Sequence, residues 1–256
     1  MSSKRPDGLC ALVLAAGLGT RLRPLTDMRP KALCPVNNVA LLDLAIASVQ
    51  PHARDIAVNV HYLGDLVREH LRGSDVVISD ETSQLLGSAG AVGHLHEWID
   101  GRAVLVRNSD AYLTDDLHSL VSGWDGSRPR ILGVDLGRPS DFGSIQYVGA
   151  CLLPGALAAQ LPDRFASLYD LVWAPAWTSG DLEIVRSAGE FWDCGTPRDY
   201  LRANLAASGG ANVIGAGATV AGSLDRVVVW DGGYVGPDEH LRTCIRVGRD
   251  VTVDAN

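Results

Sequence analysis

A glycine loop placed directly after an apolar run constrains the fold of this chain more than any other stretch. Residues 9–16 form an unbroken apolar run, which is typical of a strand buried on both faces of a parallel sheet. The run ends at Gly17 and Gly19, where the missing Cβ allows a tight turn and close approach of a ligand. Four cations follow within the next dozen residues: Arg21, Arg23, Arg29 and Lys31. This combination favours a polyphosphate site, with amides to line it and cations to neutralise it, over a plain strand-to-helix turn with solvated arginines.

Two better-known phosphate loops do not match this stretch. The dinucleotide fingerprint needs a third glycine at a fixed spacing, and the ATPase loop needs a lysine directly after its glycines. Pro24 and Pro30 restrict the backbone around them, so we expect residues after Thr20 to form an extended loop with little helix.

Residues 14–26 (LAAGLGTRLRPLT) and 29–36 (RPKALCPV) resemble the signature of the sugar-1-phosphate nucleotidyltransferases. This family includes mannose-1-phosphate guanylyltransferases and glucose-1-phosphate thymidylyl- and uridylyltransferases. The resemblance implies that Arg21 holds the leaving β- and γ-phosphates, and that Lys31 bridges the α-phosphate and the attacking phosphate. It also implies that the nucleotide is bound by the following residues of the loop: Leu14, Ala15, Ala16, Gly17, Gly19 and Thr20.

Nucleotidyl transfer brings two anions together, so its main demands are positioning and charge neutralisation, with a divalent metal as the expected helper. Magnesium suits one or two carboxylates together with phosphate oxygens. Asp110 follows the apolar strand pattern at residues 103–106, and Asp193 lies in the segment FWDCGTP. By resemblance both bind Mg²⁺; from the residues alone, each could instead be a turn former, with Pro197 starting a helix.

Two further segments resemble family motifs. Residues 84–90 (QLLGSAG) resemble the segment beside the base and ribose, which implies nucleotide contacts for Gln84, Gly87 and Ser88; Ser88 could equally cap a helix. The sugar phosphate is assigned by resemblance to Asn108 and Gly149, and Arg138 is expected to substitute for a residue of the family that this chain lacks. Residues 133–142 lack the lysine of many relatives, and Arg138 offers a planar fork in place of a point charge.

Composition excludes several partner classes. The 256 residues are 46% hydrophobic and 20% charged, with a net charge of −8, which argues against nucleic acid or an anionic membrane as the main partner. The five cysteines contain no C-x-x-C pair, so we expect reduced thiols and no zinc site. The first eight residues are polar and the run behind them is too short to span a bilayer, so we expect a cytoplasmic protein.

The order of predicted elements defines the fold class. Strands at residues 9–16, 55–60, 76–78 and 103–106 alternate with helices at 41–49, 63–71 and 91–98. Further strands are expected at 130–136, 144–153, 182–186 and 191–192, with helices at 154–161, from Ser167 and at 197–207. We therefore predict a Rossmann-like α/β domain of the nucleotide-diphospho-sugar transferase type. Its mixed, mainly parallel sheet carries helices on both faces.

The last segment changes character. Residues 213–236 repeat small apolar residues and glycine at steps of roughly six, which resembles the hexapeptide coils of a left-handed β-helix. Such a short tail allows too few coils to stand without packing on something else. We predict a catalytic domain at 1–210 and a short β-rich tail at 211–256, which either closes the domain or contacts a second subunit of a homo-oligomer.

The sequence thus predicts an enzyme that transfers a nucleotidyl group from an NTP to a sugar 1-phosphate, with Mg²⁺ as cofactor. The products are an NDP-sugar and pyrophosphate. The alternative is a catalytically silent relative that binds a nucleotide sugar and regulates a partner. The nucleobase and the sugar stay open at this point.

Overall fold

The computed structural model describes residues 8–256. Residues 1–7 of the polar stretch on which the cytoplasmic expectation rests lie outside the described residues. The chain divides into two compact units, described separately below. Unit 1 holds residues up to 17, 45–109 and 113–191, and unit 2 holds residues 18–44, 110–112 and 192–256. Two short strands, β7 (Ala111–Leu113) and β11 (Phe191–Asp193), lie at the points where the chain passes from one unit to the other.

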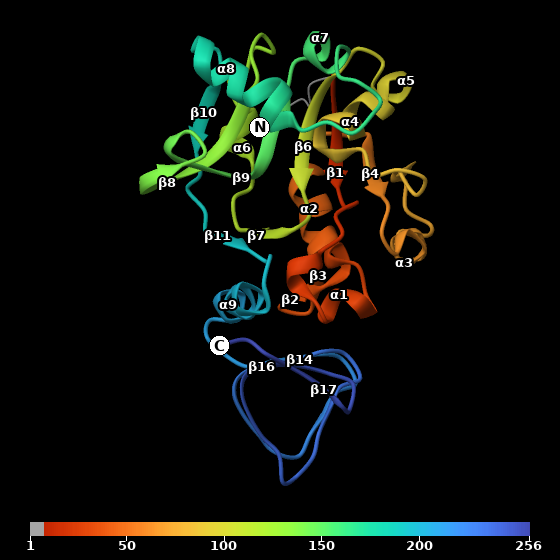
Figure 1. Cartoon of the computed structure of the whole chain (residues 1–256), viewed down its shortest axis with the longest axis vertical. Coiled ribbons are helices and arrows are strands. Elements are labelled where there is room, and N and C mark those ends of the chain that lie inside the picture. Colours follow the sequence, from red (N-terminus) through yellow and green to blue (C-terminus); the bar gives the residue numbers. More distant parts are fainter. Residues whose placement is uncertain (1–7) are drawn as a thin grey trace. The chain divides into compact units, whose positions relative to one another are not determined.

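Unit 1 is built on a seven-stranded sheet in the order β10-β8-β9-β6-β1-β4-β5. Its strands are β1 (Leu9–Leu14), β4 (Ile56–Val60), β5 (Val77–Asp80), β6 (Ala103–Asn108), β8 (Arg130–Ser140), β9 (Gly143–Leu153) and β10 (Glu183–Arg186). Four pairings are parallel, whereas β9 runs antiparallel to both β6 and β8. The labelled strands of this sheet can be followed in Figure 1. The predicted mixed, mainly parallel sheet is confirmed.

Helices cover this sheet on both sides. The helices of unit 1 are α3 (Gly64–His70), α4 (Gly87–His94), α5 (His96–Ile99), α6 (His118–Val121), α7 (Gly155–Ala158), the π-helix η3 (Tyr169–Trp173) and α8 (Ala174–Ser179). Alternate residues of β1 face opposite ways, and Cys10, Ala11, Leu12 and Val13 are all fully buried. A strand this apolar is stable only where both faces of its sheet are covered.

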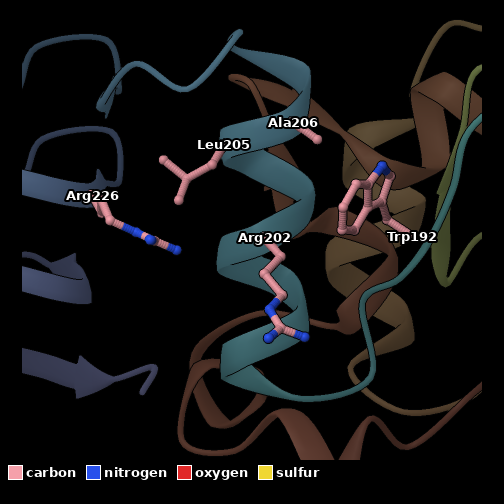
Figure 2. A pocket seen from close by; sticks show the side chains of 5 residues that line it. All are labelled: Trp192, Arg202, Leu205, Ala206 and Arg226. Atoms are coloured by element: carbon pink, nitrogen blue, oxygen red, sulfur yellow. The ribbon is translucent and has the colours of Figure 1, made fainter.

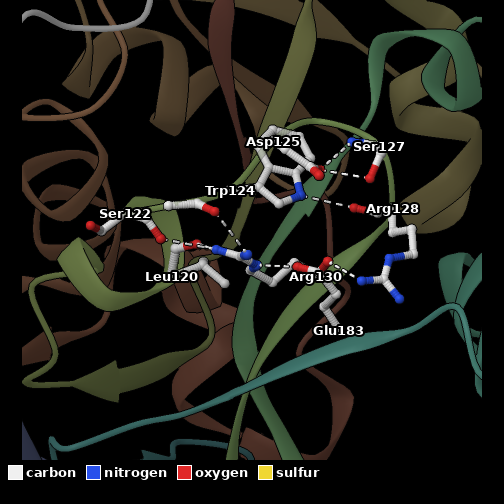
Figure 3. A network of polar contacts seen from close by, with 9 residues as sticks. Leu120, Ser122, Trp124, Asp125, Ser127, Arg128, Arg130 and Glu183 are labelled. Carbon is white, nitrogen blue, oxygen red and sulfur yellow. Dashed lines mark hydrogen bonds and ion pairs between the residues drawn. The ribbon is translucent and has the colours of Figure 1, made fainter.

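Ion pairs fasten the outer strands of this sheet (Figure 3). The Nε of Arg130 on β8 donates to Oε2 of Glu183 on β10 over 2.6 Å, and Arg128 Nη2 lies 2.9 Å from Oε1 of the same carboxylate. The remaining N–H groups of Arg130 donate to backbone carbonyls of Leu120, Ser122 and Gly123. This guanidinium therefore ties β8, β10 and the turn after α6 together.

Unit 2 begins with short helical turns and ends in a parallel coil. Its elements before the coil are η1 (Thr20–Leu22), α1 (Leu25–Met28), η2 (Lys31–Leu33), β2 (Pro35–Val36), β3 (Val39–Ala40) and α9 (Pro197–Ala207). Helix α2 (Leu41–Val49) starts in unit 2 and continues into unit 1. Helix α9 has Thr196 as N-cap, with its hydroxyl oxygen accepting from the Asp199 amide, and Pro197 in its first turn.

The C-terminal strands are β12 (Val213–Ile214), β13 (Thr219–Val220), β14 (Ser223–Val229), β15 (Tyr234–Val235), β16 (His240–Val247) and β17 (Val251–Asp254). Strands β12, β14 and β16 pair in parallel, as do β13 and β15, and β17 returns antiparallel. Figure 1 shows this blue segment as a triangular outline. The coil is present, whereas its left-handedness and the domain boundary at residue 210 stay predictions.

One apolar core joins the coil to the rest of unit 2. Tyr200 and Leu201 of α9 pack with Val228, Trp230 and Ile245 of the coil and with Cys34 and Val36 of the N-terminal turns. Trp230 Nε1 donates to the Tyr200 hydroxyl over 3.0 Å, and that hydroxyl donates to the Pro35 carbonyl. The tail therefore packs on the segment that contains the predicted phosphate-binding loop.

Three local predictions are wrong. Residues 20–33 are not extended: they form three helical turns, because Pro24 and Pro30 occupy N-cap positions, which proline tolerates. The helix predicted at 91–98 begins at Gly87 and is interrupted at Leu95. Ser88 does not cap it, since this residue lies inside α4 and its hydroxyl accepts from the Leu168 amide over 2.9 Å.

All five cysteines are buried and free. Burial raises the pKa of the Cys10 thiol to about 11 and that of Cys34 to about 12. Within residues 8–256, no helix is both long enough and apolar enough to cross a membrane.

Candidate active site

The Gly19 end of the glycine loop, in unit 2, packs against side chains of the residues that follow it. Gly19 adopts φ +62°, in the left-handed region, and its carbonyl accepts from the buried Thr26 hydroxyl over 2.8 Å. A Cβ at Gly19 would lie 2.8 Å from Thr26 Cγ2 and 3.2 Å from Lys31 Cβ. Both conformation and space therefore require glycine here, and this fixes the loop against the residue that carries the predicted catalytic ammonium.

Lys31 and the two predicted metal ligands meet in unit 2. The Lys31 ammonium nitrogen lies 3.2 Å from Asp110 Oδ2 and 3.8 Å from Asp193 Oδ1. The lysine side chain is only 10% exposed, whereas those of Asp110 and Asp193 are 49% and 42% exposed. The Cys194 amide donates to the Asp110 carbonyl over 3.2 Å, so a backbone hydrogen bond fixes the spacing of the two aspartates.

Arg21 completes this charged cluster. Its Nη1 lies 3.9 Å from Asp193 Oδ2, and 68% of its side chain is exposed. A Cβ at Gly195 would lie 2.8 Å from Arg21 Nη2 and 2.9 Å from Asp193 Oδ2, so a glycine leaves room for both groups. Two cations and two carboxylates thus converge without a net charge, with Arg21 open to solvent and Lys31 largely enclosed.

Arg29 has a different place. Its guanidinium lies 4.4 Å from the centre of the Trp230 ring, and its Nη2 lies 3.3 Å from Asp231 Oδ1. Arg29, one of the four cations of the loop and two residues before Lys31, therefore binds the C-terminal coil.

The other predicted nucleotide-binding residues lie in unit 1, except Thr20. Ala15 and Ala16 are 6% and 4% exposed, so their backbone groups rather than their side chains are available to a ligand. The Leu14 carbonyl accepts from both the amide and the hydroxyl of Ser109, at 3.1 and 2.8 Å. Gly17 is exposed, and a Cβ there would meet no atom within 4 Å. Thr20, in unit 2, is exposed at the start of η1.

Sequence reasoning missed a buried polar pair beside this segment. Asn59 Oδ1 accepts from the Ala15 amide over 2.7 Å, and Asn59 Nδ2 donates to Glu81 Oε1 over 2.7 Å. Glu81 Oε2 accepts from the Leu86 amide over 3.0 Å. Burial raises the pKa of the Glu81 carboxyl, since the side chain is 1% exposed, and the hydrogen bonds from Asn59 and Leu86 oppose the rise. A single polar residue in the apolar run IAVNV was the available signal.

The Gln84–Ser88 region owes part of its sequence to packing. Gly87 has φ +70°, and a Cβ there would lie 2.6 Å from the Ala166 carbonyl oxygen. Gly90 and Gly93 allow equally close approach of the Arg164 and Pro162 carbonyls to α4. Gln84 is exposed. The backbone conformation and the close approach of Ala166 therefore account for glycine at position 87. The predicted contact of Gly87 with a nucleotide is not needed to explain this residue.

Two of the three predicted sugar-phosphate residues are neighbours. A Cβ at Gly149, where φ is +86°, would lie 3.3 Å from Asn108 Cβ and 2.9 Å from Arg107 Nη1. Arg107 is buried, and its Nη1 donates to the carbonyls of both residues, at 2.7 Å to Asn108 and 3.1 Å to Gly149. Arg138 lies apart from them along the hairpin, exposed on β8 near the turn to β9.

A separate pocket of about 530 Å³ lies beside α9 (Figure 2). It is lined by Trp192, Arg202, Leu205, Ala206 and Arg226, none of which belongs to the predicted site. Arg226 reaches toward α9 from the coil, and Trp192 lies on the other side of the helix. Within the described residues, no group of three or more His, Cys, Asp or Glu side chains could hold a metal ion. A metal ion at the predicted Asp110–Asp193 pair would need further ligands, such as phosphate oxygens.

Comparison with known proteins identifies the family of this chain. The sequence model of the nucleotidyl transferase family matches residues 10–149. This chain belongs to the nucleotidyl transferase family. The N-acetylmuramate alpha-1-phosphate uridylyltransferase of Caulobacter vibrioides is 34% identical, and the match covers 75% of this chain and 94% of that protein. A putative mannose-1-phosphate guanyltransferase of Sulfolobus acidocaldarius is 25% identical over 76% of this chain and 62% of its own length.

Solved structures agree with the nucleotidyl transferase assignment at the level of fold. A Thermus thermophilus structure described as mannose-1-phosphate geranyltransferase superposes with a TM-score of 0.72 at 19% identity, covering 96% of this chain and 94% of that one. The predicted family and fold class are therefore confirmed.

Proposed function

We propose that this chain transfers a nucleotidyl group from an NTP to a sugar 1-phosphate, with release of pyrophosphate. The observation that carries the proposal is the cluster of Arg21, Lys31, Asp110 and Asp193 in unit 2. Such a cluster offers cations for a triphosphate beside two partly exposed carboxylates for a metal. A catalytically silent relative is not favoured, because all four residues are intact and brought together.

The reaction needs no proton transfer. A phosphate oxygen of the sugar 1-phosphate forms a bond to the α-phosphorus, and the bond from that phosphorus to the bridging oxygen breaks, so the electron pair leaves with pyrophosphate. Lys31 is assigned to the negative charge shared by the α-phosphate and the incoming phosphate, where its low exposure strengthens the interaction. Arg21, which is open to solvent, is assigned to the leaving β- and γ-phosphates.

Asp110 and Asp193 are assigned as ligands of a Mg²⁺ ion. Two carboxylates without a third protein ligand suit an ion that retains water and phosphate oxygens in its coordination shell. When bound, the ion supplies charge neutralisation for the phosphates of the nucleotide. The Lys31 ammonium lies 3.2 Å from Asp110 and 3.8 Å from Asp193, so its charge is assigned to the same small region as that of the metal ion.

The nucleoside is assigned to unit 1, through the backbone of Leu14–Gly17 and the segment at Gln84, Gly87 and Ser88. The sugar phosphate is assigned to Asn108 and Gly149, with Arg138 as a more distant candidate. Because the Caulobacter relative matches over almost its whole length, UTP and N-acetylmuramate α-1-phosphate are the first substrates to test. We also propose that residues 211–256 contact a second subunit of a homo-oligomer, and sedimentation analysis of the oligomeric state tests this.

Pyrophosphate release is the deciding measurement. Each of five NTPs (ATP, GTP, CTP, UTP and dTTP) would be combined with sugar 1-phosphates, including those of N-acetylmuramate, mannose and glucose, with and without Mg²⁺. We expect release that needs both substrates and the metal, and turnover with one preferred pair. Binding of nucleotide sugars without turnover of any pair would refute the enzymatic proposal and favour the silent alternative.

A further inference from the structure

The buried Asn59–Glu81 pair in unit 1 connects two segments that are distant in sequence. One end of the connection is the Ala15 amide, in the loop after β1, and the other is the Leu86 amide, at the start of α4. Both side chains are almost fully buried, at 3% and 1% exposure. Ionisable side chains are rarely placed at such depth without a specific task.

Donor and acceptor chemistry fixes the direction of every hydrogen bond in this chain of contacts. A backbone amide can only donate, so the Asn59 oxygen must face Ala15 and its NH₂ group must face Glu81. The Leu86 amide likewise donates to the second Glu81 oxygen. Glu81 therefore accepts at both oxygens, as a carboxylate does best, and the Asn59 amide cannot flip without losing its hydrogen bonds to Ala15 and Glu81.

The backbone of Glu81 is held as well. Its carbonyl lies 2.6 Å from His61 Nδ1, and it accepts from the Gln84 amide over 3.1 Å. The Leu14 carbonyl, next to Ala15, is fixed from the other side by Ser109. The side chains of Asn59 and Glu81 thus set the position of Ala15 relative to Leu86 within a rigid polar frame.

We propose that Asn59 and Glu81 are positioning residues for the nucleoside of the NTP, acting through the Ala15 and Leu86 backbones. This inference rests on the proposed function, which assigns the nucleoside to residues 14–17 and 84–88. Neither side chain touches the ligand: together they hold the two nucleoside-facing segments at one fixed separation. Loss of the pair is therefore expected to weaken NTP binding much more than it slows the chemical step.

An exchange of the two side-chain types tests this idea. Glu81→Gln presents an NH₂ group either to Leu86 or to Asn59, both of which are donors, so one hydrogen bond is lost. Asn59→Asp sets two carboxylates against each other at the 2.7 Å contact. The double variant Asn59→Asp/Glu81→Gln reverses the central bond: the side-chain amide introduced at position 81 donates to the carboxylate introduced at position 59, while Ala15 and Leu86 keep their acceptors. Net charge and the number of hydrogen bonds are then those of the natural chain.

The experiment measures the dissociation constant and KM of the preferred NTP, kcat and the melting temperature for the natural chain and the three variants. We expect each single change to raise the dissociation constant and KM about tenfold with kcat changed less than threefold, and the double variant to recover within threefold. Lower melting temperatures with unchanged NTP affinity, or a folded double variant that does not recover NTP affinity, would overturn the inference.

Two further outcomes are distinguishable. Should a single variant not fold, the double variant alone decides, because it retains all three hydrogen bonds and must still bind NTP like the natural chain. Should the natural chain itself turn over no NTP with any sugar 1-phosphate, the proposed function fails, and this inference fails with it. If the natural chain turns over its substrates and the single variants bind NTP as well as it does, only the positioning role of Asn59 and Glu81 is refuted.

Discussion

Replacing Lys31 by methionine removes one positive charge from between two carboxylates and keeps most of the enclosed side-chain stem. If the ammonium neutralises charge that develops in the transition state, its loss costs about 3 kcal/mol, or roughly a hundredfold in turnover. The effect on folding is expected to be much smaller. The two carboxylates, 3.2 and 3.8 Å from Nζ, are 49% and 42% exposed, so solvent screens both pairs. Partly exposed pairs contribute about 0–1 kcal/mol to stability.

Pyrophosphate release and thermal unfolding measure these two effects side by side. We expect kcat of Lys31→Met to fall about a hundredfold while the melting temperature shifts by no more than about 4 °C. The concentration of Mg²⁺ for half-maximal activity should not rise, because the lost ammonium opposed a cation at Asp110 and Asp193. Arg242→Met is the matched control, since it removes an exposed cation from an ion pair with Asp225 in the same unit. Activity of Lys31→Met within threefold of the natural chain would refute the role of Lys31.

Four further predictions concern single residues. Asp193→Asn should raise the Mg²⁺ concentration for half-maximal activity about tenfold or more, whereas the exposed Asp225→Asn should leave it unchanged in the same titration. Gly17→Ala should raise the NTP dissociation constant in calorimetry without lowering the melting temperature, because its Cβ meets no atom of the chain; Gly8→Ala, with equal space, should change neither. Gly90→Ala should lower the free energy of unfolding by about 2 kcal/mol in urea titrations, since its Cβ would lie 2.2 Å from the Arg164 carbonyl oxygen, and an unchanged midpoint would contradict this packing. Burial raises the pKa of Glu81 above its ordinary 4.5, so the folded state binds more protons than the unfolded state above that pH. The stability of the natural chain relative to Glu81→Gln should therefore decrease as pH rises from 4.5 to 7, and a rise would contradict the burial argument.

Elements with strong local signals were predicted nearly to the residue. Helix α9 lies at Pro197–Ala207 because a capping threonine and a first-turn proline mark its start and two glycines follow its end. The helical turns at residues 20–33 were not predicted, because a proline at a helix N-cap and a proline in an extended loop look the same in a sequence. Contacts between residues that are further apart favour the helical turns. One example is the hydrogen bond from the Thr26 hydroxyl to the Gly19 carbonyl, seven residues away.

The candidate site was predictable where chemistry and motif coincide. Lys31, Asp110 and Asp193 are far apart in sequence and yet meet, as the motif order predicted. Their roles stay predictions until turnover is measured. The sequence could not reveal that Arg29 binds Trp230 and Asp231, because no local pattern connects residues two hundred positions apart. Asn59 and Glu81 were missed for the same reason: each is bound to a partner that only the sheet brings near.

The contact of Arg29 with Trp230 and Asp231 has a consequence for chimaeric proteins. A tail taken from another protein and joined at residue 210 preserves the setting of Arg29 only if it brings an aromatic ring and a carboxylate to the corresponding places. Arg29, in the loop that carries Lys31, therefore restricts which tails can be joined at residue 210 by gene fusion or recombination, although the joint lies far from Arg29 along the chain. Tail and loop are expected to be inherited together.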